Sequence, residues 1–502
     1  MMHRYTACLV AILLTVSLFF GTVAAQPVTA DEARTAAQNH VNRTIARLGN
    51  WGGQPQALAA DVQPFGRNGR ELGYYVTIDP DGYVILFNHR RMPVVKAYGT
   101  RGRIDITEEH GPAALIKGRM SKHVDHVEKR LGKKLAEAQA SDWRQVPDQA
   151  DQSPAWDALL QGGIQVSATP PITTYQGMDY QPGQVLLTSH WVQGYPYNNQ
   201  CPYMGCSGQP NGRALVGCVA TAGVQILRYW AWPPCDSAGR YVDAYNWTNM
   251  PDTISGASPA DQINCVAAAS ASVGNSVGMD YGCSSSGAMT YDMEQVFENR
   301  RYPNTGVADR SAFTDSEWYD RVTSQISQNQ PVQYRVDEHS IVGDGWYTEV
   351  VGGVTEKWYH FNYGWGAGDD IWYLFDGYPL GAGDEEYMVR RISPDVSLGT
   401  TLSGAYARET LSVNHFDKPT RYFNRDCTGT SAAFAAGQAF QYVRPGLWIR
   451  NVGTLGTDAI TFQGTPPTGT SEFYHRAPYG DKRIRILEGQ LKLLAGGEMR
   501  LR

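Results

Sequence analysis

The chain has 502 residues, of which 42% are hydrophobic and 18% are charged, and its formal net charge is −6. A chain of this length holds about two to four domains with sizeable cores. The small negative charge gives no reason to expect nucleic acid or an anionic membrane as a partner. The 53 glycines and 29 tyrosines are typical of a loop-rich protein with much β-structure.

The N-terminus, residues 1–25, has the pattern of a secretory signal peptide. Arg4 precedes an apolar run from Ala7 to Phe20, and Val23-Ala24-Ala25 fits a small-residue cleavage site before Gln26. The run is short for a membrane span, and no later segment reaches membrane length. We therefore expect a secreted protein, extracellular or periplasmic, without a membrane span, in which disulfides are permitted.

Export makes the cysteine count informative. Of the eight cysteines, Cys8 lies in the signal peptide, which leaves an odd number. An odd cysteine in an exported chain is either intermolecular or a free reactive thiol. If Cys218 is the free one, the others can form bridges whose pairing does not follow from the sequence; they are Cys201, Cys206, Cys235, Cys265, Cys283 and Cys427.

The region after the signal peptide is predicted to begin with a small α+β unit. Its expected elements are a helix at 33–48, strands at 73–78, 83–87 and 93–98, and a helix at 112–139. Asp79-Pro80-Asp81-Gly82 is a good hairpin turn between the first two strands. The polar, proline-containing stretch 140–175 is expected to be a connector or an exposed loop.

Residues 180–395 place helical patterns first and aromatic strands after them, which is an α+β order. The patterns are a helix from Cys218, helices near 259–275 and 314–328, and strands at 332–335, 340–342, 358–362 and 371–374. Residues 396–502 show short β-like runs with Gly-rich turns, which predict a β-rich, sandwich-like domain. No CxxC pair, HExxH or phosphate-binding loop occurs, so no metal or other cofactor is expected.

Cys218 begins a helix that ends before Pro233-Pro234. A thiol in the first turn lies at the positive end of the helix dipole, which favours thiolate over thiol. The alternative is that Cys218 is a buried small hydrophobe or half of a disulfide. The apolar stripe of the helix recurs at spacings of three and four, at Val219, Ala222, Ile226 and Trp230.

Four residues elsewhere in the chain can supply what a thiolate nucleophile needs. His339, just before the strand at 340–342, is the candidate base, although an inert core histidine is the alternative. Asn362 is placed to accept the imidazole Nδ1–H, with Trp365 as a shield from water, unless the two are an ordinary turn residue and an ordinary core residue. The amide of Gln193 can join the Cys218 backbone N–H as an oxyanion hole, where one donor lowers the barrier by about 3 kcal/mol.

Four segments in this order together resemble the streptopain family of bacterial cysteine proteases, peptidase family C10, which is papain-like. They are Trp191–Asn198, Gly217–Ala222, Val277–Ser284 and His360–Gly366. The resemblance spans about residues 180–395, and the hairpin region 73–100 also resembles the propeptide of that family. The last hundred or so residues are not covered by it.

The resemblance implies an α+β, papain-like catalytic domain in a secreted proenzyme. Its implied divisions are a signal peptide (1–25), a propeptide (26–175), the catalytic domain (176–395) and a β-rich C-terminal domain (396–502). Cys218 would be the nucleophile, His339 the general base and acid, Gln193 the oxyanion donor, and Asn362 and Trp365 the supports of the imidazole. The loop lining the substrate cleft would contribute Met279, Tyr281, Gly282, Ser284 and Ser285.

The chain departs from the family pattern at two positions beside the site. Glu338 stands before the histidine where the family usually has Gly, and Tyr363 follows the asparagine where the family usually has Trp. A carboxylate at Glu338 favours the imidazolium or obstructs the cleft. Neither departure removes a reacting group, so both bear on rate and specificity.

The expected function is therefore a cysteine endopeptidase that cleaves protein or peptide substrates, is inhibited by its own propeptide, and requires a reducing environment. Two alternatives stay open. The chain is a weak or inactive pseudo-protease that acts as an extracellular binding protein, or it is a cysteine-dependent amidase or acyl transferase that uses the same residues on a non-protein amide.

Overall fold

The computed structural model describes residues 27–108, 111–139, 141–146, 151–162, 180, 182–230, 250–300, 302–337, 339–377 and 385–393, with short strands between 420 and 501. The predicted signal peptide, the stretch 163–179 in which the predicted propeptide ends, and Glu338 lie outside the described residues. No helix among the described residues combines the length and the apolar character needed to cross a membrane.

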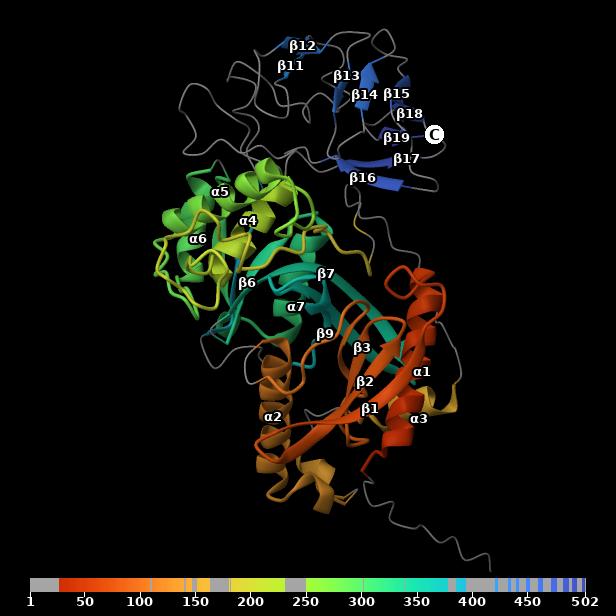
Figure 1. Cartoon of the computed structure of the whole chain (residues 1–502). Coiled ribbons are helices and arrows are strands. Elements are labelled where there is room, and N and C mark those ends of the chain that lie inside the picture. Colours follow the sequence, from red (N-terminus) through yellow and green to blue (C-terminus); the bar gives the residue numbers. More distant parts are fainter. Residues whose placement is uncertain are drawn as a thin grey trace, which may run out of the picture.

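The N-terminal part is a four-stranded antiparallel meander with helices on both faces (Figure 1). Its strand β3 has alternate residues in two separate buried clusters. Ile85 and Phe87 share a cluster with Met120 of α2, whereas Val84 and Leu86 share the other with residues of α1. The elements are α1 (Ala30–Leu48), β1 (Leu58–Arg67), β2 (Arg70–Asp79), β3 (Tyr83–Phe87), β4 (Val95–Gly99) and α2 (Pro112–Leu131).

The expected connector 140–175 contains a helix, α3 (Ser153–Gln161), which corrects the prediction. Trp156 is fully buried, and its indole N–H donates to the carbonyl oxygen of Met92 at 3.0 Å. Asn39 of α1 donates to the carbonyl oxygen of Leu159 at 2.6 Å. The helix is thus held by contacts with distant parts of the chain. The amino-acid composition of the stretch itself does not indicate such contacts.

The central part contributes helices that pack on the other half of the sheet. Its elements are α4 (Cys218–Trp230), α5 (Ala260–Ser276), α6 (Met293–Glu298), β5 (Gly306–Asp309), α7 (Asp315–Ser327), β6 (Val332–Val336), β7 (His339–Val351), β8 (Val354–Asn362), β9 (Asp370–Leu374) and β10 (Tyr387–Arg390). In Figure 1 the helices α4, α5 and α6 lie together beside β6 and β7. The observed mixture of helices and a large antiparallel sheet confirms the predicted α+β class.

Strand β7 continues well past the predicted segment 340–342. The sequence Gly343-Asp344-Gly345 looks like a turn, but it is an irregularity in the pairing of β7 with β8, and the strand runs on to Val351. The fully buried Asp344 carboxylate accepts from the backbone N–H of Leu187 at 3.1 Å and bonds the imidazole of His360 at 2.6 Å. The bulge therefore serves to bury and satisfy a carboxylate within the strand.

All ten strands belong to one sheet, in the order β1-β2-β3-β4-β9-β8-β7-β6-β10-β5. The N-terminal and central parts meet where β4 pairs with β9, antiparallel, through Ala97 opposite Tyr373 and Tyr98 opposite Trp372. The two segments predicted as propeptide and catalytic domain thus share a continuous sheet, and two residue pairs are described between β4 and β9.

Side chains reinforce this junction on one face of the sheet. The buried His40 of α1 contacts Tyr98 of β4 and Trp358 of β8, with ring centroids 4.7 and 5.9 Å away. Burial, together with the nearby charges of Arg47 and Arg43, lowers the pKa of His40 to about 3. The imidazole is therefore neutral in the folded protein near neutral pH.

Ion pairs cross the same junction from β4 and α2. The buried Lys96 ammonium and the Nδ1 atom of His123, which lies 3.0 Å away, both contact the Asp376 carboxylate. Arg119 of α2 lies 2.8 Å from the carboxylate of Asp337. Asp337 precedes the start of β7 by two residues, so α2 is anchored close to His339.

The C-terminal region contains short strands, in line with the expected β-rich domain. Its strands are β11 (Thr420–Tyr422), β12 (Ala432–Phe434), β13 (Ala439–Gln441), β14 (Trp448–Asn451), β15 (Ala459–Gln463), β16 (Ser471–His475), β17 (Lys482–Ile486), β18 (Gln490–Leu493) and β19 (Met499–Leu501). The strands β11 and β12 pair with each other, and the other seven form a sheet in the order β13-β14-β15-β18-β19-β17-β16.

Candidate active site

Cys218 is the first residue of α4, as the sequence predicts, and the turn before it requires glycine. Gly217 has φ +87°, which side-chain-bearing residues rarely adopt. A Cβ atom there would lie 2.7 Å from the sulfur of Met279. The Gly217 carbonyl oxygen accepts from both the backbone N–H and the hydroxyl of Thr221, each at 3.0 Å. The half-buried thiol is thus held at the positive end of the helix.

His339, at the start of β7, is close enough to the Cys218 thiol to act on its pKa. Burial alone would raise the pKa of Cys218. The charge and the hydrogen bond of His339, a bond from the Ser340 backbone and the charge of Arg335 outweigh burial and lower this pKa to about 7. A thiol with such a pKa is substantially ionised at neutral pH, as nucleophilic cysteines are.

The far side of the imidazole is fixed by a backbone group. His339 Nε2 lies 2.9 Å from the carbonyl oxygen of Tyr363. A carbonyl oxygen only accepts hydrogen bonds, so Nε2 carries the proton and Nδ1 is left to face the thiol. The ring also stacks on Trp365, with centroids 4.1 Å apart and planes 17° apart. The predicted proximity of Trp365 to the imidazole is therefore present.

Asn362 is close to these residues, but it does not take the predicted part. Its amide oxygen accepts from the backbone N–H of Gly364 and from Nε2 of Gln225, both at 3.0 Å. The prediction that Asn362 accepts the Nδ1–H is wrong on both atoms, because the bonded nitrogen is Nε2 and its acceptor is the carbonyl oxygen of Tyr363. The reason is that Asn362, the last residue of β8, turns its side chain toward α4, and the carbonyl group that follows faces the histidine.

Gln193 is held near the nucleophile through its backbone. Its carbonyl oxygen accepts from the N–H of Val216 at 2.9 Å, two residues before Cys218. Its side chain is half-buried. Tyr195, two residues further on, donates its N–H to the amide oxygen of Gln209 at 3.0 Å, which braces the same loop. The loop is therefore held beside the residues that lead into Cys218.

The predicted cleft loop, 279–286, lies against the residues that precede Cys218. Met279 is buried beside Gly217. Gly282 accepts from the backbone N–H of Leu215 at 3.1 Å, and a Cβ at Gly282 would lie 2.3 Å from the carbonyl oxygen of Ser285. The hydroxyl of Ser286 donates to the carbonyl oxygen of Leu215 at 2.8 Å.

The other predicted cleft residues are arranged differently. Ser284 and Ser285 are exposed at the tip of the loop. The hydroxyl of Tyr281 is directed to α5, 3.3 Å from the amide oxygen of Asn275. Burial and the neighbouring Cys201 raise the pKa of Tyr281. Tyr281 thus braces the loop against α5.

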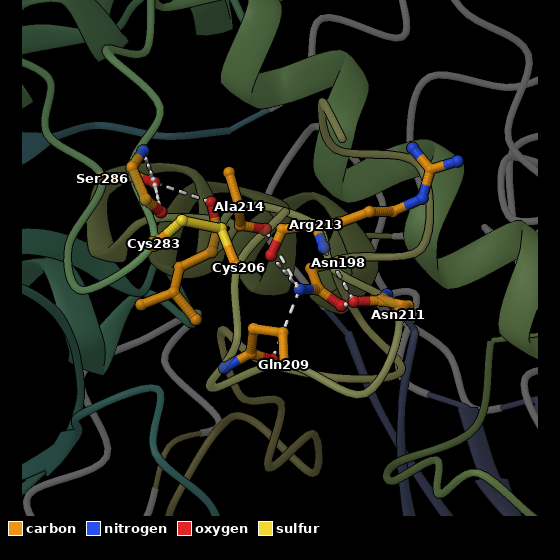
Figure 2. The surroundings of a disulfide bond; sticks show 10 residues. Asn198, Cys206, Gln209, Asn211, Arg213, Ala214, Cys283 and Ser286 are labelled. Carbon is orange, nitrogen blue, oxygen red and sulfur yellow. Dashed lines mark hydrogen bonds between the residues drawn. A yellow bond between two sulfur atoms is a disulfide. The ribbon is translucent and has the colours of Figure 1, made fainter. Parts of the chain in front are cut away.

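A disulfide joins this loop to the loop that carries Gln193. Cys206 and Cys283 are bonded across 77 residues of sequence, and Figure 2 shows the bond beside a network centred on Asn198. Asn198 is fully buried and donates to the carbonyl oxygen of Ala214 at 3.0 Å, while its own oxygen accepts from Asn211 at 2.8 Å. The bond and the network hold the two loops together ahead of Cys218.

Another described cysteine, Cys201, is a different kind of thiol. Cys201 is buried and free. Burial raises the pKa of Cys201 to about 11, although the Tyr281 hydroxyl and Arg213 act in the opposite direction. At neutral pH Cys201 is protonated and inert, in contrast to Cys218. Two of the cysteines that were considered for bridges, Cys235 and Cys427, lie outside the described residues.

Sequence reasoning missed two participants in this arrangement, the Tyr363 carbonyl group and Gln225. The position of Gln225 carried a signal, because a glutamine seven residues after Cys218 falls on the same side of a mostly apolar helix. Among the described residues, no group of three or more His, Cys, Asp or Glu side chains is arranged to hold a metal ion. The arrangement is suited to attack by a thiolate on a carbonyl carbon.

A thiol at a helix start, paired with an imidazole whose other nitrogen is fixed, defines the class of papain-like cysteine peptidases. The sequence profile of the Peptidase C10 family matches residues 191–373. The chain is 26% identical to streptopain of Streptococcus pyogenes over 407 residues, which is 72% of this chain and 91% of streptopain. It is 29% identical to the thiol protease/hemagglutinin PrtT of Porphyromonas gingivalis over 200 residues, 35% of this chain and 22% of PrtT.

Residues 191–373 thus match the Peptidase C10 family, and the similarity to streptopain and PrtT supports a streptopain-like, cysteine-type peptidase. Among solved structures, a fragment of prointerpain A of Prevotella intermedia is 19% identical to the chain. That comparison covers 66% of this chain and 98% of the fragment, with a TM-score of 0.46.

Proposed function

We propose that the chain is a secreted cysteine endopeptidase made as a proenzyme, with Cys218 as its nucleophile. The observation that carries the proposal is the contact between Cys218 and His339, with the pKa of the thiol lowered to about 7. In this mechanism the thiolate attacks a peptide carbonyl carbon, and the sulfur–carbon bond forms as the carbonyl oxygen gains negative charge. His339 then protonates the leaving amine, and water hydrolyses the acyl-enzyme with His339 as base.

The negative oxygen of the tetrahedral intermediate requires donors. The backbone N–H of Cys218 has no intrahelical acceptor, because it is among the first N–H groups of α4. The amide of Gln193 is the proposed second donor, supported by the bond that holds its backbone beside Val216. One such donor contributes about 3 kcal/mol to lowering the barrier. Trp365 and Asn362 are proposed to support the imidazole, Trp365 by stacking and Asn362 through its bond to Gly364.

The proposed cleft is formed in part by the loop with Met279, Tyr281, Gly282, Ser284 and Ser285. The structure favours two groups among them. Met279 lies beside Gly217 and borders the nucleophile, and the two exposed serines are free to meet a substrate chain. Tyr281 and Gly282 are proposed to act by shaping the loop.

The N-terminal part, 26–175, is proposed to be the propeptide and an intramolecular inhibitor of the catalytic part, 176–395. Support comes from the ion pair of Arg119 with Asp337, close to His339, and from the buried contact of Lys96 with Asp376. Release of the segment would require a cut in the chain between about residues 140 and 180, outside the anchored helix α3.

The test is to incubate the purified precursor with a thiol reductant and follow its intact mass, beside Cys218→Ala. We expect the wild type to lose an N-terminal segment that ends between about residues 140 and 180 and then to cleave casein. The Cys218→Ala variant should stay whole and inactive. Circular dichroism of both proteins controls for folding.

Two other outcomes would indicate a different function for the chain. If neither protein shortens and Cys218 of the wild type resists iodoacetamide, the peptidase mechanism is wrong and a binding role is indicated. If Cys218 is alkylated and small amides are hydrolysed while casein and peptides stay intact, an amidase or acyl transferase is indicated. Full proteolysis by Cys218→Ala would contradict the assigned nucleophile.

A further inference from the structure

Gln225 of α4 lies at the meeting point of the segments that carry the proposed catalytic groups. Its side chain is fully buried. Its amide nitrogen donates to Oδ1 of Asn362 at 3.0 Å, and its oxygen lies 3.4 Å from Nδ2 of Asn362. The same oxygen accepts from the backbone N–H of Trp191 at 3.1 Å. Gln225 and Asn362 thus form a reciprocal pair of amides, and each side of the pair makes further bonds.

One arm of this pair leads to the imidazole. Asn362 Oδ1 also accepts from the N–H of Gly364 at 3.0 Å. This bond spans Tyr363, whose carbonyl oxygen receives the Nε2–H of His339. A side-chain oxygen that accepts from the N–H two residues later fixes the turn between them. The orientation of the Tyr363 carbonyl group therefore depends on Asn362, and that of Asn362 on Gln225.

The other arm leads to the oxyanion donor. Asn362 Nδ2 donates to the carbonyl oxygen of Ser189 at 2.8 Å, while Gln225 holds the N–H of Trp191. These bonds flank the backbone that enters the loop of Gln193, two residues beyond Trp191. The pair thereby ties the loop to the helix that begins with Cys218.

We propose that Gln225 is a positioning residue that sets the relative placement of thiol, imidazole and oxyanion donor through its amide pair with Asn362. The proposal rests on the proposed function, because it assigns the placement that Cys218 and His339 need for peptide hydrolysis. The pair is shielded from water, so its bonds have no competing partners, and its loss leaves several buried polar groups unsatisfied. Small displacements of reacting groups cost rate more than substrate affinity.

The central experiment compares Gln225→Met with a matched control, Gln325→Met. Methionine keeps the length of the side chain and removes both polar atoms. Gln325 of α7 is also a buried glutamine whose oxygen accepts a backbone N–H, that of Arg391 at 2.8 Å, away from the site. Both variants should lose thermal stability, because each loses the hydrogen bonds of a buried glutamine. The control therefore matches the test variant in its effect on folding.

Only Gln225→Met should change the chemistry. We expect kcat for a peptide substrate to fall about ten- to a hundredfold with KM nearly constant. The pKa of Cys218, measured by the pH dependence of its alkylation with iodoacetamide, should rise from its value of about 7. The reason is that an imidazole without a fixed acceptor at Nε2 stabilises the thiolate less. Gln325→Met should keep the wild-type kcat and the wild-type alkylation profile.

A second variant, Gln225→Glu, supplies a rescue. A buried carboxyl group with no cation beside it stays protonated to higher pH. In that form it can accept from Trp191 and donate to Asn362, as the glutamine does. We expect near-wild-type kcat at about pH 6 and a new loss of kcat as pH rises and the carboxyl group ionises.

The outcomes separate this proposal from the function on which it rests. A folded Gln225→Met with wild-type kcat and an unshifted alkylation profile overturns the positioning role, while an inactive Cys218→Ala keeps the peptidase. If Gln225→Met does not melt cooperatively, Gln225→Glu decides: a new alkaline loss of kcat supports the proposal, and a wild-type profile overturns it. A wild type that neither alkylates nor cleaves peptides removes the proposed function itself.

Discussion

Replacing His339 with alanine should change the reactivity of Cys218 in a way that reverses sign with pH. The imidazole is the largest of the groups that lower the pKa of the thiol to about 7, and without it burial should bring the pKa back to about the free-thiol value of 8.5. That shift of about 1.5 units corresponds to about 2 kcal/mol. At about pH 7 the thiolate fraction would fall about fifteenfold, from one half to roughly one thirtieth.

Nucleophilicity partly offsets this loss. A thiolate of higher pKa attacks faster, with a Brønsted coefficient of about 0.4–0.5, which gives about fivefold for this shift. The alkylation rate of His339→Ala should therefore be about threefold below wild type near pH 7 and about fivefold above it near pH 10. Peptide hydrolysis should fall much further, by about 10²–10⁴, because the general acid is lost as well.

The assay is the rate of mass increase with iodoacetamide across this pH range. Cys201 has a pKa of about 11 and stays unreactive near neutral pH, and Cys218→Ala gives the joint contribution of Cys201 and the half-buried Cys265 at each pH. The variant His126→Ala, changed in α2, is the control for loss of a histidine. Parallel pH curves for His339→Ala and wild type, without a crossing, would refute the assigned ion pair.

Three further changes probe the scaffold. Replacing His40 with phenylalanine should make the free energy of unfolding fall less steeply as the pH is lowered. The wild-type imidazole is neutral when folded, because its pKa is about 3 in the folded protein and about 6.5 in the unfolded chain. Its contribution is present above about pH 6.5 and is lost at up to about 1.4 kcal/mol per unit as pH falls toward the folded pKa, measured by urea unfolding; equal slopes would contradict this. Gly217→Ala should lower the free energy of unfolding by at least about 1 kcal/mol and be partly rescued by Met279→Ala, and a neutral Gly217→Ala would argue against the tight turn. Removing the disulfide with the double change Cys206→Ser and Cys283→Ser should cost about 4 kcal/mol in urea unfolding without reductant, and an unchanged midpoint would show that the bond does not restrain the unfolded chain.

The sequence allowed the α4 helix, the hairpin turn at 79–82 and the order of the catalytic segments to be predicted, since all depend on near neighbours. Helix α3 could not be found in this way, because Trp156 and Leu159 have apolar partners only after the chain has folded back on α1. The continuation of β7 through Asp344 was hidden for a similar reason. The residues around Asp344 favour a turn locally, and His360 and Leu187 satisfy its carboxylate from elsewhere.

In the site, too, the sequence predicted which residues come together but not which hydrogen bonds they form. A cysteine, a histidine and an asparagine in this order predicted which side chains gather. The acceptor of the imidazole N–H, however, is a backbone carbonyl group of Tyr363, which every residue possesses and no sequence pattern marks. Gln225 was detectable in principle as a polar residue within an apolar helix, but its bonds to Asn362 and Trp191 depend on the packing of three separate segments.

The pairing of β4 with β9 turns two would-be edge strands into interior ones. Each belongs to a meander, and separation of the two meanders would expose a row of unpaired backbone N–H and C=O groups on both. On the catalytic side that edge is apolar and aromatic, with Ile371, Trp372, Tyr373 and Leu374 in succession. Such an edge recruits strands from other molecules, as in aggregation or strand addition. The N-terminal meander thus covers an edge of the catalytic sheet. If the meander left, that edge would have to rearrange or pair with another strand.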